Sequence, residues 1–124
     1  MNEDIEKIFQ GKLTVDEKEI PISFAKYVGS SEDYIVYFNG NNTPFFSSDD
    51  ETEYSKSEID FNVYTKGNYL KIVKQLKKMM KENDYDWTGD AGDLYEEDTK
   101  YHHFVVTFEK IRRVWNGKNR FKKF

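Results

Sequence analysis

Residues 58–80, EIDFNVYTKGNYLKIVKQLKKMM, contain two periodic patterns that decide the fold. In the first, Ile59, Phe61 and Val63 alternate with polar residues, which predicts a strand with one buried and one wet face. In the second, apolar residues recur at helical spacing and lysines occupy the opposite side. The apolar set is Tyr69, Ile72, Val73, Leu76, Met79 and Met80. Gly67 and Asn68 stand between the patterns as a strand stop and a helix cap, so we expect an amphipathic helix lying on a sheet.

Further elements are expected on both sides of this unit, from apolar spacing and from β-branched and aromatic runs. They are a helix at residues 2–10, strands at residues 20–28, 33–38 and 102–114, and a short extra strand at residues 94–97 after a loop rich in Gly and Asp. Sequential strands without an intervening helix usually form hairpins. We therefore expect an α+β fold, in the order α-β-β-β-α-β(β). Its sheet should be antiparallel or mixed, with four to five strands and both helices on one face.

The segment between the second and third predicted strands is the least regular part of this pattern. Residues 39–44, NGNNTP, are strong turn formers, and the second strand can resume through Phe45 and Phe46 beyond them. An acidic patch then closes that strand. We expect a turn at residues 39–44 and a loop over the acidic residues.

Length and composition indicate one domain. A chain of 124 residues is too short for two independent cores, and 17% of its residues are aromatic, which favours a packed interior. We assign residues 1–115 to a single domain and residues 116–124 to a basic, flexible tail. The absence of cysteine excludes disulfides, thiolate zinc sites and cysteine nucleophiles. No membrane-spanning run and no signal-peptide pattern occur, so a soluble, unprocessed protein is expected.

The charge is divided unevenly along the chain. Residues 110–124 contain seven basic residues and no acidic residue, so residues 1–109 carry 12 basic against 23 acidic residues. The formal charges are therefore +7 for the end of the chain and −11 for the rest. An acidic body repels a nucleic-acid backbone, whereas the basic end could contact phosphates or another protein's acidic surface.

The residues offer no pattern typical of an enzyme. His102 and His103 are adjacent in a predicted strand and so point to opposite faces, which prevents them from sharing a metal ion. No serine stands in a nucleophile-elbow pattern, and the seven glycines form neither a dinucleotide fingerprint nor a phosphate loop. We expect no catalysis, no metal and no cofactor.

Three blocks of the sequence, in this order and spacing, carry a resemblance to a known family. They are residues 33–38 (DYIVYF), residues 54–66 leading into the amphipathic helix, and Trp87 with residues 94–104 leading into the last alternating strand. Together they resemble the small tail-terminator proteins, also called tail-completion or head-tail joining proteins, of long-tailed siphophages of Gram-positive bacteria and their prophages. The acidic segment at residues 89–93 and the basic tail beyond Val114 do not match that family.

The resemblance implies a non-catalytic virion protein at the head-tail junction, present in the host cytoplasm during assembly. Such a protein forms a ring of about six subunits that caps the tail tube and faces the head connector. The partners are then further copies, the tail tube protein and the connector protein, with DNA passing unbound and no membrane involved. Exposed segments that become ordered on contact would leave a monomer or weak oligomer in dilute solution.

The candidate contact residues lie in two segments. Acidic residues after the second strand are expected to face the lumen or a neighbouring subunit, and Arg, Trp and Phe are favoured in protein interfaces. The candidates are Phe45, Phe46, Asp49, Asp50, Glu51, Glu53, Arg112, Arg113 and Trp115. Two alternatives stay open: another phage neck or head-completion adaptor, and a small regulatory or nucleic-acid-binding domain acting through the basic C-terminus.

Overall fold

The structure is a computed structural model that describes residues 2–46 and 52–115. Within these residues, two helices and six strands follow one another along the chain. They are α1 (Asn2–Phe9), β1 (Lys12–Val15), β2 (Lys18–Phe24), β3 (Tyr34–Phe46), β4 (Thr52–Thr65), α2 (Tyr69–Glu82), β5 (Asp86–Glu96) and β6 (Tyr101–Trp115). The strands form one sheet in the order β1-β2-β3-β4-β6-β5.

The expected α+β class is confirmed, but the sheet has six strands, and one of its pairings is parallel. β2 and β3 pair in parallel over three residue pairs, from Ile22 with Ile35 to Phe24 with Tyr37, so the expected hairpin between them is wrong. The strand expected at residues 20–28 ends at Phe24 because Ala25, with φ 65°, turns the chain away. Since the parallel overlap spans only about 10 Å, residues 25–33 can return the chain without a helix.

The additional strand at the start of the sheet is β1, which forms an antiparallel hairpin with β2. The two residues of its turn, Asp16 and Glu17, have φ values of 49° and 67°. Positive φ at both central residues is the geometry that matches the twist of a two-residue hairpin, and it is usually supplied by Asn-Gly. The sequence did not predict this hairpin because its turn contains Asp-Glu and not Asn-Gly.

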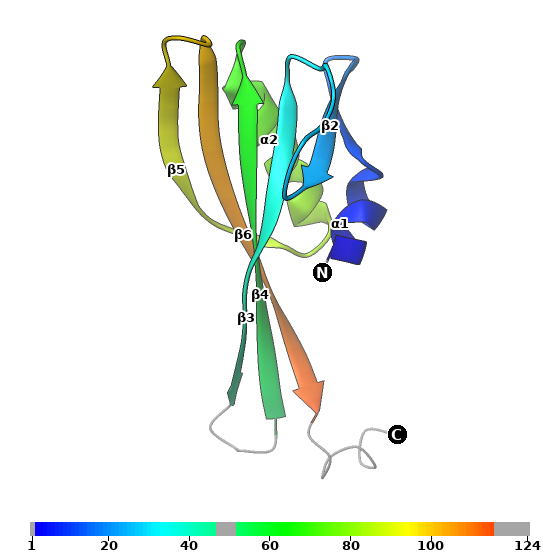
Figure 1. The fold of residues 1–124 in the computed structure, drawn as a ribbon. Helices are drawn as coiled ribbons and strands as arrows, with labels where there is room; N and C mark the ends of the chain where they lie inside the picture. The colour runs from blue at the N-terminus through cyan, green and yellow to red at the C-terminus, as the bar shows by residue number, and fades with distance from the viewer. Residues whose placement is uncertain (1, 47–51, 116–124) are drawn as a thin grey trace.

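Both helices lie on one face of the sheet, as expected, and share its core (Figure 1). Ile59, Phe61 and Val63 of β4 are fully buried on that face, while the residues between them are partly exposed, so the predicted alternation is confirmed. The Phe61 ring meets the rings of Phe9 from α1 and Phe108 from β6 edge-on, at 5.9 and 5.8 Å between centroids. Phe61 therefore links α1, β4 and β6 within a core to which both helices contribute.

The predicted amphipathic helix is confirmed as α2. Asn68 caps it by accepting a hydrogen bond from the backbone N–H of Leu70 at 2.9 Å. Its buried residues are Ile72, Val73, Leu76 and Met80, and Met79 packs at the border of the core. The methionines thus fill the interior together with the aliphatic side chains.

A polar network joins the ends of three strands on the side of the sheet where β3 begins. Asp33, which is buried, accepts a hydrogen bond from Thr65 Oγ1 at 2.7 Å and forms an ion pair with Lys18. Burial alone would raise the pKa of Asp33, but the hydrogen bonds from Lys18 and Thr65 outweigh burial and hold this pKa below its usual value. The network therefore ties β2, β3 and β4 together through one carboxylate.

The segment rich in Gly and Asp is mostly strand, where a loop and a short strand at 94–97 were expected. β5 pairs with β6 along its length, with register irregularities between Trp87 and Gly89 and between Ala91 and Asp93. Each irregularity absorbs one extra residue, so the alternation that marks a strand is interrupted twice. The alternation of apolar residues therefore predicts only the last residues of β5.

Candidate protein interface

β3, β4 and β6 continue beyond the body of the molecule as a three-stranded arm, which comprises residues 39–46, 52–58 and 110–115 (Figure 1). Pairing continues to the ends of the described strands, where Phe46 is opposite Glu53 and Thr52 is opposite Trp115. Figure 1 shows both helices beside the body and none along the arm. The arm is therefore a sheet extension outside the hydrophobic core.

The arm contains a bulge where a turn was expected. Register is lost between Asn39 and Asn42, after which β3 resumes its pairing with β4, so residues 39–44 do not reverse the chain. Gly40 lies against the partner strand, and a Cβ at this position would stand 2.7 Å from Glu58 Cβ. The turn-forming residues serve instead to bring two backbones together at the base of the arm.

The structure brings the two candidate segments into one place. Phe45 and Phe46 lie in β3, Glu53 in β4, and Arg112, Arg113 and Trp115 in β6. In register, Tyr54 of β4 stands between Phe45 and Arg113, although these residues are far apart in the sequence. The remaining candidates, Asp49, Asp50 and Glu51, lie outside the described residues, as does the basic tail at residues 116–124.

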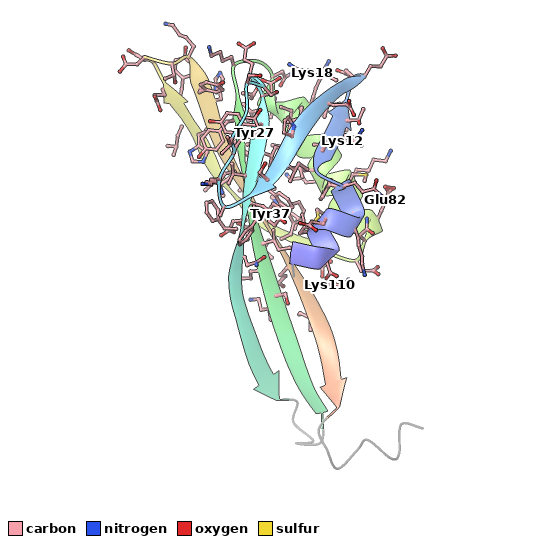
Figure 2. The ribbon with its side chains drawn as sticks, turned by 45° about the vertical axis from the view of Figure 1, so that its right-hand side comes forward. Lys12, Lys18, Tyr27, Tyr37, Glu82 and Lys110 are labelled. Atoms are coloured by element: carbon pink, nitrogen blue, oxygen red, sulfur yellow. The ribbon has the colours of Figure 1, made fainter. Side chains whose placement is uncertain are left out.

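The side of the sheet opposite α1 and α2 is a second candidate surface, which we call the helix-free face. It carries Tyr34, Phe38, Asp60, Tyr64 and His103. An aromatic stack crosses three of its strands at the end away from the arm. The Tyr34 ring lies 4.8 Å from that of Tyr64, and the Tyr64 ring lies 4.4 Å from that of His103, all nearly parallel. Tyr27, from the loop before β3, stacks on Tyr34 at 4.6 Å (Figure 2). The rings thus stack on one another across the strands.

The surroundings of His103 in this stack favour its neutral form. Its Nε2 lies 2.8 Å from Asn62 Oδ1, and a carbonyl oxygen only accepts, so Nε2 carries the proton. Burial lowers the pKa of His103. His102 is on the opposite face, where its Nδ1 lies 2.8 Å from Asp93 Oδ2, so the expectation that the two histidines point apart is confirmed.

A carboxylate cluster, formed by Glu58, Asp60 and Glu109, occupies the helix-free face at the base of the arm. Glu58 and Glu109 are directly opposite each other in register. Lys56 reaches both, at 3.4 Å from Glu58 Oε1 and 3.0 Å from Glu109 Oε2, and Glu109 is the main cause of the raised pKa of Lys56. Asp60 accepts a hydrogen bond from the Thr107 hydroxyl at 2.7 Å. Lys56 is thus shared between two of the three carboxylates, and Asp60 is held by Thr107.

Exposed apolar side chains lie on the same face. Phe38 is 43% exposed, Ile111 is 50% exposed and Leu94 is 64% exposed. Phe38 is in register with Asp60, and Ile111 is in register with Lys56, so apolar and charged side chains alternate near the arm. Lys110, by contrast, lies near α1 at the base of the arm, with its Nζ 5.0 Å from the Tyr85 ring centroid (Figure 2).

The described residues include a hollow beside α1 but no cluster of metal-binding side chains. No three side chains of His, Asp or Glu among them gather closely enough to hold a metal ion. A hollow of about 370 Å³ between α1, β2 and β3 is lined mainly by apolar residues, with Glu6 and Tyr37 as its titratable groups. Neither described helix is both long and apolar enough to cross a membrane.

No protein-family model matches the chain, and no curated protein matches it either. The arm, the helix-free face and the sequence are therefore the basis for a functional proposal. The arm contains most of the contact residues expected from the sequence. The aromatic stack and the carboxylate cluster were not expected, because both depend on strand register, which the sequence does not reveal.

Proposed function

We propose that the protein is a structural subunit at the head end of a long-tailed phage tail, where a ring of about six copies caps the tail tube and meets the head connector. The resemblance of residues 20–110 to tail-terminator proteins suggests this function. The observation that carries the proposal is the three-stranded arm, because such an arm contributes little to the stability of an isolated subunit and suits contacts between subunits.

The edges of the arm support this interpretation. Within the described residues, β2 pairs with β3 only as far as Tyr37, and β5 pairs with β6 only as far as Glu109. The outer backbone groups of β3 after Asn39 and of β6 after Lys110 therefore face no neighbouring strand in the described part of the chain. Long open edges invite pairing with other chains, and assembling proteins use them for strand addition.

The charge of the body supports the passage of DNA without adsorption. Phosphate binding is driven by lysine and arginine, whereas residues 1–109 carry an excess of 11 acidic residues. On the helix-free face, the rings stack on one another and the carboxylate cluster adds negative charge. The carboxylates would therefore repel the phosphates of a nucleic-acid strand, although the rings of this face could otherwise stack on its bases.

Disruption of the gene in a phage that encodes it tests this function. Electron micrographs should show overlong tails and heads that lack tails, because tube growth is no longer ended and joining fails. Expression of the intact chain from a plasmid should restore normal particles, while a chain lacking the arm should not. Tails of normal length beside unjoined heads would contradict the proposal and favour a head-completion adaptor.

A further inference from the structure

The base of the arm on the helix-free face combines exposed apolar side chains with excess negative charge. Phe38 and Ile111 are about half exposed there, and both flank the carboxylate cluster of Glu58, Asp60 and Glu109. With Lys56 included, these four charged side chains sum to −2. The surface therefore suits a ligand that presents cations together with aromatic or aliphatic groups.

Among the described side chains, Lys56 is the cation that pairs with the cluster. Glu58 and Glu109 face each other across β4 and β6, and like charges directly opposite in a ladder are destabilising. Lys56 contacts both carboxylates, and its side chain is only 37% exposed, so this single ammonium group is shared in a half-buried site. An additional cation from outside would offset the remaining repulsion.

The chain itself contains a segment of matching chemistry. Residues 116–124, NGKNRFKKF, follow β6 and contain four cations, two phenylalanines and no acidic residue. Arginine and aromatic residues are the types that contribute most to protein contacts. The charges are complementary: the segment carries +4 and the cluster carries −2 with Lys56 included.

The direction of β6 favours a neighbouring copy as the recipient. Trp115 is six residues after Glu109 along the strand, so β6 carries the segment about 20 Å away from the cluster of its own chain. Nine further residues reach at most about 30 Å, and they would have to reverse direction at once to return. A neighbour placed beyond the arm receives the segment without such a reversal.

We propose that residues 116–124 of one subunit dock on the helix-free face of the next subunit, over the carboxylate cluster and beside Phe38 and Ile111. This contact joins two different surfaces, so repetition gives a ring or an open helix. The inference rests on the proposed function, because a closed ring is the form it requires. The docking of this segment is the subunit contact that would build the ring.

Two full-length variants separate the two halves of the contact. The acceptor variant carries Glu58→Gln and Glu109→Gln, and the donor variant carries Lys118→Gln, Arg120→Gln, Lys122→Gln and Lys123→Gln. Sedimentation velocity at about 50 mM salt should show wild-type association that rises with protein concentration and weakens at 500 mM salt. Each variant alone should associate about tenfold more weakly than wild type.

Mixing the variants gives the decisive result. The acceptor variant keeps an intact donor segment and the donor variant keeps an intact face, so an equimolar mixture should form heterodimers about tenfold more tightly than either variant associates alone. A control with Asp16→Asn and Glu17→Gln removes two carboxylates at the β1–β2 turn and should associate like wild type. Circular dichroism of each variant verifies that the fold is kept.

Three outcomes would overturn the proposal. They are a wild-type chain that stays monomeric at about 200 μM and low salt, a mixture without heterodimers, and a donor segment that binds duplex DNA but not a second copy. Failure of the function proposed above is recognised separately, because head-to-tail association in solution does not depend on tail length in micrographs. Normal tails after gene disruption together with heterodimers would reject the function alone.

Discussion

Replacement of Asp33 tests how the body is held together where β2, β3 and β4 meet. In Asp33→Ala, the buried Thr65 hydroxyl loses its acceptor and Lys18 loses its partner. Hydrogen bonds to a charged group contribute about 1.5–3 kcal/mol, whereas an ion pair with a largely exposed lysine contributes at most about 1 kcal/mol. We therefore expect a loss of about 2–3 kcal/mol for Asp33→Ala and about 1 kcal/mol for Asp33→Asn, which keeps an acceptor oxygen.

The pH dependence of this loss follows from the pKa of Asp33. Because the folded state lowers this pKa, ionised Asp33 stabilises the fold above the unfolded pKa of about 3.9, and this contribution disappears as pH falls through the lower folded pKa. The difference between wild type and Asp33→Asn should be full at pH 6 and shrink from about pH 5 downward. Urea unfolding at pH 6, 4 and 3 measures it.

The matched control is Asp16→Asn, which removes a carboxylate from an exposed ion pair with Lys71. We expect a change within about 0.5 kcal/mol at every pH. A pH-independent gap between wild type and Asp33→Asn, or equal losses in Asp33→Asn and Asp33→Ala, would refute the assignment of charge and hydrogen bonding in this network.

Three further changes test local features. Glu17→Gly should raise the free energy of unfolding by about 0.5–1 kcal/mol, since glycine adopts positive φ without strain, whereas Glu19→Gly within β2 should lower it; thermal unfolding distinguishes the two. Gly40→Ala should cost about 1–3 kcal/mol and loosen amide protection at the base of the arm, and Glu58→Gly should rescue it. The wild-type protein should lose stability as pH falls from about 7 to 5, because the folded state disfavours the protonated ring of His103. His103→Phe should keep the aromatic stack and abolish this loss. Wild-type urea midpoints that do not change across that pH range would contradict the burial of His103.

The parts of the fold that sequence predicts well are those in which local pattern and tertiary environment agree. Ile59, Phe61 and Val63 alternate because one face of β4 is buried along the body, and α2 keeps a single apolar stripe against the sheet. The structure contains both the alternating strand and the amphipathic helix that these patterns predict. The same alternation predicts Glu58 and Asp60 on the wet face of β4, where both side chains are partly exposed.

The parts that the sequence does not predict are those in which long-range contact overrides local preference. Residues 39–44 have the composition of a turn, yet pairing with β4 on the far side of the bulge keeps β3 extended. The parallel pairing of β2 with β3 leaves no local mark, since it depends on where residues 25–33 return the chain. The carboxylate cluster likewise requires the β4–β6 register, which alone brings Glu109 opposite Glu58.

We propose that this chain works by fitting against copies of itself and against the end of a tail tube. The most direct test mixes gold-labelled protein with purified tail tubes of the phage that encodes it and records the label positions by electron microscopy. We expect label at one end of each tube only. Label distributed along the tube wall, or no label on the tubes, would contradict it.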